Sequence, residues 1–361
     1  MQIVDSHNPN HERPTPRGRL SRVERRKARR KRGRRRLIRW TLGTIGSGVV
    51  LVLALIVIGF ATPGGTRIRM LLAETVLSTR HYYLAKYMTT PAEYKELLKE
   101  LNSPVVNTGV PAVKVAAATT TSPVQIHAIS GQGWNGYVVL IHNPRLIRLV
   151  HANVQGSMGE YITDMAKRVG AIAGVNASGF EDPNGEGWGG VAVGLELVGG
   201  QEFSEWKPSW PVVGFTQSGV MVMGDYTLTE LQAMGVRDAM QFHPELVVNG
   251  QPQITEGDGG WGQDPRTAIG QTKNGTVIFV VANGRFHGGA GLGASQRQIM
   301  DVMLQYGAYN ACALDGGSSS VLYADGRILN SPSTLDPNGQ RHLPDAWMVF
   351  PTVEAADQYT P

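Results

Sequence analysis

The longest apolar stretch of the chain runs from Trp40 to Ala61, 22 residues without a charge. A helix of that length, at about 1.5 Å per residue, spans the roughly 30 Å hydrocarbon core of a bilayer. The charged prelude at residues 1–39 is long and shows no clear small-residue cleavage site, which disfavours a removable signal peptide. The pattern therefore predicts a transmembrane helix at residues 40–61.

Helical patterns continue beyond this segment. Residues 67–88 have helical apolar spacing, and a Thr-Pro-Ala-Glu sequence at 90–93 is typical of a helix start. The helix that follows has one apolar face, formed by Tyr94, Leu97, Leu98 and Leu101. These patterns predict a helical stalk at residues 62–102, suited to packing or oligomerisation rather than to chemistry.

Residues 103–123 are small, rich in Thr and Pro and almost uncharged, which predicts a linker. The globular domain is therefore expected at residues 124–361, and this fragment is expected to fold alone. Within it, alternating apolar runs are separated by turn dipeptides at Ser218-Gly219, Asn249-Gly250, Asn274-Gly275 and Asp325-Gly326.

Two helical patterns interrupt these predicted hairpins, at about residues 158–169 and 295–306. The fold class that follows is α+β: a β-rich globular domain with two main helices, preceded by a single transmembrane helix and a short helical stalk.

Charge is distributed unevenly along the chain. Residues 1–39 hold 15 Lys and Arg against three acids, a net charge of +12, so the remainder carries −7. Such a basic run also suits nucleic acid, but its position beside an apolar segment obeys the positive-inside rule. We therefore expect a cytoplasmic tail, a single-pass anchor in the cell membrane, an extracytoplasmic domain and no nucleic-acid partner. No pattern specifies an oligomeric state.

The single cysteine, Cys312, excludes an intrachain disulfide. It lies inside an apolar run, where a buried and inert thiol is the common outcome. We therefore do not expect it to act as a catalytic nucleophile.

Two similar units each deliver a polar side chain to the end of a strand. Each runs from a helix through a glycine and an apolar strand to a polar residue, Asn176 or Asp315, followed by small residues. Duplication and chance both explain the similarity, because helix–Gly–strand units are common. In sheets with helical connections, the carboxyl ends of strands are where ligands bind.

The segment from Asp315 to Ser320 reads Asp-Gly-Gly-Ser-Ser-Ser. Gly316 and Gly317 permit positive φ or close approach of the backbone to a ligand. The serine hydroxyls and backbone N–H groups are suited to hold an anion, and Asp315 supplies an acid or an acceptor. The alternative is a turn in which the aspartate caps its own loop.

Two arginines stand at strand ends. Arg266 opens a predicted strand, and Arg285 closes its hairpin partner, so the two are expected to lie close together. A guanidinium group is suited to bind phosphate oxygens in a two-pronged way. Each arginine alone is better explained by a surface ion pair, whereas the two together at strand ends favour phosphate binding.

Metal binding is left open. Residues 182–186 (Asp-Pro-Asn-Gly-Glu) place oxygen ligands in alternation, as at the start of a calcium loop, but the remaining ligands and spacing are missing. The nine histidines show no pair with zinc spacing. The sequence therefore requires no cofactor, and a calcium ion is the one metal it suggests.

An ordered set of motifs resembles the phosphodiester glycosidase family. The set comprises RTAIG at 266–270, the helix at 295–306, ALDGGSSSVLY at 313–323, NSP at 330–332 and LPDAWMVF at 343–350. GVNASGF at 174–180 is similar to the family's Asn-Gly-Gly-Phe motif. The resemblance covers about residues 124–352 and is strongest over 264–350.

This resemblance implies a hydrolase that cleaves a sugar-1-phosphodiester at the anomeric carbon and leaves the phosphate on the other partner. Asp315 would be the base or nucleophile, with Glu181 as the second carboxylate of the usual pair. The implied substrate-binding residues are Asn176, Arg266, Arg285, Gly316, Gly317, Ser318 and Asn330. Trp188 or Trp261 would stack on a pyranose ring or belong to the core.

The chain also departs from the family pattern. Asn283 stands where relatives commonly carry a carboxylate, and Ala177-Ser178 replaces a glycine pair. The departures favour a non-catalytic module that binds anionic glycans in envelope or exopolysaccharide assembly. Asp315 and the arginines favour a membrane-anchored hydrolase acting on cell-surface or exported polysaccharide. An adaptor that acts through its stalk and tail would leave these polar residues unexplained.

Overall fold

The computed structural model describes residues 22–77, 82–101, 105–111, 113, 122–182, 186–207, 210–284 and 291–361. The chain divides into two compact units, Met1–Arg67 and Ile68–Pro361. The described part of the first unit contains α1 (Arg22–Ala61). Its segment Trp40–Ala61 is long and apolar enough to cross a membrane and is not buried by protein, consistent with the predicted span.

Short helices follow α1. They are α2 (Pro63–Leu77), the 3₁₀ helix η1 (Tyr82–Leu84), α3 (Ala85–Met88) and α4 (Pro91–Leu101). The pattern over residues 67–88 thus forms three elements, with residues 78–81 outside the described part. The predicted start of α4 is confirmed, because Thr90 and Glu93 exchange side-chain and backbone hydrogen bonds.

These helices pack on one another through a small apolar cluster of Ala73, Leu77, Ala85 and Leu97. Arg69 and Glu93 add an ion pair of 2.6 Å between α2 and α4. The hydrogen bond from Arg69 is the main reason why the pKa of Glu93 falls to about 2.

Residues of the expected linker also contact the domain. Thr108 exchanges hydrogen bonds with the backbone of Met223, which lies on an edge strand. The N–H of Val106 donates to the carboxyl group of Glu245 at 2.8 Å. Burial raises the pKa of Glu245 to about 7. The unit Ile68–Pro361 therefore includes the predicted linker and all of the predicted stalk except residues 62–67.

All strand pairs formed by the described residues are antiparallel. A seven-stranded sheet has the order β1-β2-β14-β13-β15-β11-β12 and contains β1 (Val124–Gly131), β2 (Trp134–Ile141), β11 (Glu245–Val248), β12 (Gln251–Pro252), β13 (Arg266–Thr272), β14 (Val277–Ala282) and β15 (Ala308–Leu314). A five-stranded sheet has the order β7-β6-β10-β8-β9 and contains β6 (Glu196–Val198), β7 (Gln201–Ser204), β8 (Val212–Thr216), β9 (Met221–Gly224) and β10 (Val236–Gln241).

A second five-stranded sheet has the order β17-β16-β5-β19-β3 and contains β3 (Ile147–His151), β5 (Ala173–Asn176), β16 (Leu322–Ala324), β17 (Arg327–Ile328) and β19 (Asp345–Val349). Strands β4 (Glu160–Tyr161) and β18 (His342–Leu343) pair separately. The helices are α5 (Ile162–Val169), α6 (Leu228–Ala233), α7 (Gln296–Gln305) and α8 (Val353–Gln358), with 3₁₀ turns η2 (Pro144–Leu146) and η3 (Gly317–Ser319).

The predicted fold class is confirmed. Helices α5 and α7 lie within the predicted ranges, and α7 begins with a capping box formed by Ser295 and Gln298. Asn249 and Asp325 adopt φ of 51° and 50°, as their predicted two-residue turns require. Helices α6 and α8 have six residues each, too few for a helical period to show in the sequence.

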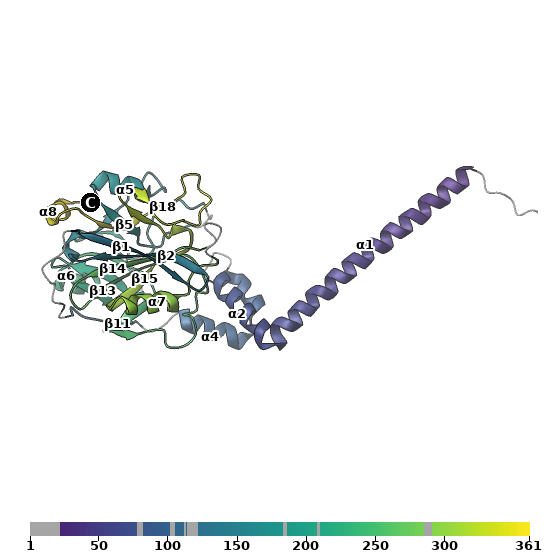
Figure 1. Cartoon of the computed structure of the whole chain (residues 1–361), viewed down its shortest axis with the longest axis horizontal. Coiled ribbons are helices and arrows are strands. Elements are labelled where there is room, and N and C mark those ends of the chain that lie inside the picture. The colour runs from purple at the N-terminus through teal and green to yellow at the C-terminus, as the bar shows by residue number, and fades with distance from the viewer. Residues whose placement is uncertain are drawn as a thin grey trace, which may run out of the picture. The chain divides into compact units, whose positions relative to one another are not determined.

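The core explains why the strands carry long apolar runs. Every residue of β14 is buried, because α7 lies against the seven-stranded sheet (Figure 1) while the other face packs on the remaining sheets. Phe215 and Trp347, from the two five-stranded sheets, meet edge to face at 5.4 Å. One apolar cluster thus joins all three sheets.

Strand register brings the candidate chemistry together. Thr267 of β13 pairs with Leu314 of β15, so Arg266 lies beside Asp315 at the same end of the sheet. The N–H of Asp315 donates to Ala177, just past the end of β5. The two strand ends singled out in the sequence therefore meet.

The contacts of residues 105–109 generate a stability prediction. A fragment starting at Val124 keeps the three-sheet core and is expected to unfold cooperatively. It is also expected to melt roughly 5–10 °C below a fragment starting at Ile68, because it loses several hydrogen bonds of about 0.5–1.5 kcal/mol each and leaves Glu245 without its N–H donor. Thermal unfolding followed by circular dichroism measures the difference; equal melting temperatures would show that these contacts contribute nothing.

Candidate active site

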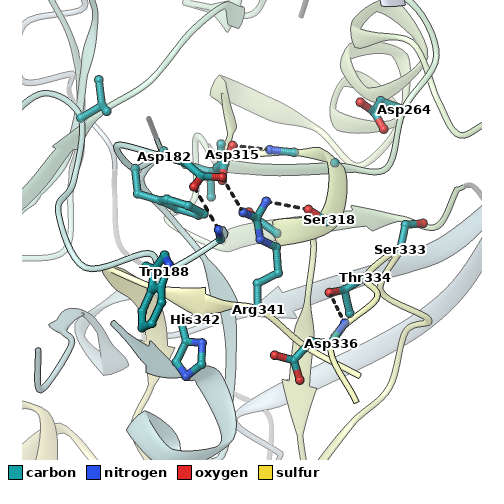
Figure 2. A pocket seen from close by; sticks show the side chains of 18 of the residues that line it. Asp182, Trp188, Asp264, Asp315, Ser318, Ser333, Thr334, Asp336, Arg341 and His342 are labelled. Carbon is teal, nitrogen blue, oxygen red and sulfur yellow. Dashed lines mark hydrogen bonds and ion pairs between the residues drawn. The ribbon is translucent and has the colours of Figure 1, made fainter. Parts of the chain in front are cut away.

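A cavity of about 930 Å³ opens where the end of β15 meets three loops. The loops come from residues 179–193, 261–266 and 333–342. Figure 2 shows Asp315, Ser318, Asp182 and Arg341 converging in it, and Asp264 set apart from this group in the lining of the same cavity. The charged and titratable residues that line the cavity are Asp182, Glu186, Asp264, Arg266, Asp315, Asp336, Arg341 and His342.

Asn176 fixes the position of Asp315. The side-chain amide of Asn176 donates to the backbone carbonyl of Asp315 at 2.7 Å. Its carbonyl oxygen accepts from the Thr267 hydroxyl at 2.8 Å and from the Val321 N–H at 3.1 Å. Asn176 is fully buried and does not line the cavity, so in this structure it joins strand ends rather than facing a substrate.

The Asp315 carboxyl group has an altered acidity. Its pKa is raised to about 6, mainly because burial disfavours the charged form, and the nearby Asp264 raises it further. Hydrogen bonds from Ser319 and the Gly316 N–H, together with the charge of Arg341, oppose the rise. The group therefore changes charge near neutral pH, as catalytic carboxyl groups often do.

Gly316 and Gly317, which follow Asp315, are each required for a different structural reason. A Cβ on Gly316 would approach the Pro265 carbonyl oxygen to 3.0 Å, and Gly317 has a φ of 60°. The backbone N–H groups of Gly316, Gly317 and Ser319 donate to protein acceptors. These three donors are therefore engaged and do not form the anion cradle suggested by the sequence. Gly316, Gly317 and Ser318 all line the cavity.

Arg341 is the cation that sequence reasoning missed. It donates to the Ser318 hydroxyl at 2.6 Å and to Asp182 at 3.3 Å, and its guanidinium lies over the Phe180 ring at 4.7 Å (Figure 2). It is held on three sides while its charge acts on Asp315. Arg341 lies two residues before the recognised LPD motif, in a stretch without periodicity, so only the fold reveals its position.

Of the two predicted arginines, Arg266 lines the cavity. Its guanidinium donates to the carbonyls of Trp261, Gly262 and Ala294, and 4% of the residue is exposed. It thus contributes a fixed positive charge and holds the loop at 261–262. Arg285 lies outside the described residues.

Glu181 and Asn330 do not line the cavity. Glu181 is exposed, and the next residue, Asp182, faces the cavity instead. Asn330 accepts from the Leu322 N–H and donates to the Ser320 carbonyl, which holds the serine turn against β16. Asp264, which is 6% exposed, is the carboxylate that lines the cavity and acts on Asp315.

Aromatic side chains also line the cavity. Trp210, Phe242 and Trp261 line it, and the His243 ring lies 4.4 Å from Trp210 and 4.8 Å from Trp261. Trp188 also lines the cavity, with 39% of its surface exposed. Trp210 and Phe242 were missed in the sequence, because aromatic residues beside strands are indistinguishable there from core residues.

The family departures lie outside the cavity lining. Asn283 accepts from the Ser331 N–H and donates to Asn135, a bond that an ionised aspartate could not make. Ser178 is fully buried and donates its N–H and hydroxyl to Asp345. The Asp345 carboxyl has a pKa raised to about 8, mainly by burial, and does not line the cavity either.

The carboxylates close enough to hold a metal, among the described residues, are Glu74, Glu100 and Asp258, which do not line the cavity. Burial and Asp258 raise the pKa of Glu74 to about 8, so Glu74 is protonated at neutral pH. At the suggested calcium loop, Asp182 accepts from the Gly187 N–H and from Arg341, while residues 183–185 lie outside the described part.

Comparison with known proteins adds independent findings. A family model for phosphodiester glycosidase matches residues 169–350. An SPbeta prophage-derived uncharacterized protein of Bacillus subtilis is 29% identical over 189 residues, which cover 48% of this chain and 27% of that relative. The chain thus spans only about a quarter of that relative's length.

A solved structure gives the fold comparison. The catalytic domain of zebrafish N-acetylglucosamine-1-phosphodiester alpha-N-acetylglucosaminidase, auto-inhibited by its pro-peptide, aligns with a TM-score of 0.56 and 16% identity. The alignment covers 66% of this chain and 87% of that domain. At this identity the likeness establishes a shared fold.

The bonds of Asn176 generate a prediction that separates a positioning role from a binding role. Asn176→Ala leaves the Thr267 hydroxyl, the Val321 N–H and the Asp315 carbonyl without their partner, at about 1–3 kcal/mol for each unsatisfied group. We expect Asn176→Ala to lose at least about 3 kcal/mol of stability, measured by urea denaturation. Ser318→Ala, in the cavity, is the control and should lose less than about 1 kcal/mol. If Asn176→Ala were as stable as the unmodified chain, the positioning role of Asn176 would be wrong and a substrate-binding role would be favoured instead.

Proposed function

Because the chain belongs to the phosphodiester glycosidase family, we propose that it hydrolyses a sugar-1-phosphodiester at the anomeric carbon. Water replaces the phosphodiester oxygen on the sugar, and the phosphate leaves as a monoester on the other partner. The observation that gives this the most support is that Asp315, whose pKa is raised to about 6, lines one cavity together with Asp264 and Arg341. For the substrate we propose cell-surface or exported polysaccharide, on the basis of the predicted membrane orientation.

Two carboxyl groups carry the chemistry in this proposal. Asp315 acts at the anomeric carbon as nucleophile or as the base that takes a proton from water. Asp264 replaces Glu181 as the second carboxyl group of the pair, because it lines the cavity and acts electrostatically on Asp315. The negative charge of Asp264 disfavours ionisation of Asp315 and so contributes to its raised pKa.

Arg341 and Ser318 hold the departing phosphate. Bond cleavage leaves an additional negative charge on the phosphate oxygen, and a pre-oriented guanidinium stabilises that charge more than it stabilises the substrate. Arg341 is pre-oriented by Asp182 and by the Phe180 ring. Because the phosphate is a good leaving group, its departure depends less on protonation by the second carboxyl group than the departure of the leaving group does in ordinary glycosidases.

The aromatic residues that line the cavity bind the sugar. Trp210, Phe242 and Trp261 present apolar surface next to the end of β15, since Pro244 accepts a hydrogen bond from Ala313 of that strand. The C–H groups on one face of a pyranose ring pack against such surfaces, while the polar groups of the cavity fix its orientation.

The alternative is a non-catalytic module that binds anionic glycans. Its main support in the sequence is the missing carboxylate at Asn283. That position does not line the cavity, and its amide bridges Asn135 and Ser331. The departure therefore removes no charge from the cavity, which favours the hydrolase.

Substitution of the carboxyl groups tests the proposal directly. Against a panel of sugar-1-phosphodiesters, Asp315→Asn is expected to lower kcat/KM by at least roughly 10²–10⁴-fold, the usual effect of losing a general base, and Asp264→Asn by a similar factor. Glu181→Gln is the matched control and should retain turnover. If the panel contains a substrate that the unmodified chain hydrolyses, normal turnover of that substrate by Asp315→Asn would contradict the catalytic role assigned to Asp315.

The thermal stability of Asp315→Asn distinguishes a loss of activity due to the missing carboxyl group from a loss of activity due to misfolding. The folded-state pKa of Asp315 is about 6, above the value of about 3.9 in unfolded chains. The stabilisation due to this shift is therefore complete below about pH 4 and is lost as the pH rises through 6. Asp315→Asn removes the cost of ionisation, so its melting temperature at pH 7 should not fall.

The pH dependence of activity gives a further prediction. If ionised Asp315 is required, kcat/KM should rise with pH and level off above about 6. Arg341→Gln removes a charge that lowers this pKa, so the rising limb should move to higher pH in addition to the loss of rate. A limb that stays in place in Arg341→Gln would show that another group controls the profile.

A further inference from the structure

The helices just after the apolar segment carry an unusual concentration of exposed apolar surface. Among the described residues, seven exposed large apolar or aromatic side chains lie between Ile68 and Leu98, against six in the whole of Val106–Pro361. We call this group the juxtamembrane patch; its members are Ile68, Leu72, Tyr82, Tyr83, Leu84, Tyr87 and Leu98.

The patch is distinct from the packing face of the same helices. On α2, Arg69, Ala73 and Leu77 are buried, while Ile68 and Leu72, one helical turn apart, are exposed. On α3, Ala85 is buried and Tyr87 is 82% exposed. Packing within the compact unit therefore accounts for one face of these helices, while the side chains of the patch remain exposed to solvent.

Chain length restricts where the patch can lie. Ile68 is seven residues beyond Ala61, the end of the apolar segment. Even a fully extended chain of seven residues reaches only about 25 Å. If Trp40–Ala61 spans a bilayer, Ile68 is therefore held within that distance of the end of the hydrocarbon core.

The side chains of the patch suit the boundary between lipid headgroups and acyl chains. Tyrosine is enriched there, because its ring is apolar and its hydroxyl remains hydrated. Lys86, whose ammonium lies 5.6 Å from the Tyr94 ring, is exposed beside the tyrosines and suits anionic headgroups. Elements of this kind lie in the interface plane with their apolar groups buried by about 5–10 Å.

We propose that the juxtamembrane patch docks on the lipid surface, so that the domain is seated on the membrane by α2, η1, α3 and α4 rather than held away from it on a free stalk. A second copy of the chain would also cover apolar surface. The bilayer is favoured because the chain itself holds Ile68, the first residue of the patch, within about 25 Å of it in every molecule, at any protein concentration.

Depth-dependent fluorescence quenching tests this in the full chain. A single environment-sensitive label is placed at Tyr87→Cys, which is exposed, while the native Cys312 is fully buried. The matched control is Lys167→Cys, also exposed, on α5, which lies far from α4 within the same unit (Figure 1). Both proteins are reconstituted in vesicles of phosphatidylcholine and phosphatidylglycerol that contain spin-labelled lipid.

The expected result is blue-shifted emission and at least twofold quenching at position 87, with no quenching at position 167. Absence of quenching at position 87 would overturn the proposal. Energy transfer between differently labelled copies at position 87 without lipid quenching would also overturn it and would assign the patch to self-association. Both readouts are independent of catalysis, so neither depends on the proposed hydrolase activity.

Discussion

The candidate site depends on one buried amide. Asn176 ties the end of β5 to the residue after β15 and at the same time accepts hydrogen bonds from β13 and from the segment after the serine turn. These strands belong to two different sheets, and no ladder hydrogen bond joins β5 to β15. A buried amide with three protein partners is costly to disturb, because every group it satisfies would be left unpaired away from water.

This junction explains why a carboxyl group is followed by such small residues. The Asp315 backbone is held by Asn176 and Ala177, and the turn that follows passes close to the Pro265 carbonyl, where a Cβ on Gly316 would crowd it. Burial at this place raises the pKa of Asp315, while Arg341 keeps the ionised form accessible near neutral pH. Position and acidity thus follow from the same packing.

Local patterns in the sequence were sufficient to predict part of the fold and part of the candidate site. The turn dipeptides, the two helices and the delivery of Asp315 could be predicted, because each depends on residues within about ten positions of one another. Asn176 was recognised as the residue equivalent to Asp315 in a similar helix–strand unit and was expected to bind a substrate, since a sequence does not show which strand ends meet. Glu181 was chosen where its neighbour Asp182 faces the cavity. In an irregular loop no period fixes which side chain points inward.

Arg341 and Asp264 illustrate what only the fold provides. Arg341 acquires its role from Ser318, Asp182 and Phe180, which lie 23, 159 and 161 positions away in the chain. Asp264 was visible beside Arg266, but nothing in the sequence distinguished it from the other acids in glycine-rich loops. Similarly, Asn283 looked like the loss of a carboxylate that relatives commonly carry, whereas its amide joins β2 to the segment at Ser331.

The central claim is that the bond between the sugar and the phosphate oxygen breaks on the sugar side. Hydrolysis in water enriched in oxygen-18, followed by mass spectrometry of the phosphate product, tests it most directly. Cleavage at the anomeric carbon predicts that the released phosphate monoester contains no solvent oxygen and that the label enters the sugar. Oxygen-18 in the phosphate monoester would mean attack at phosphorus and would contradict the roles given to Asp315, Asp264 and Arg341.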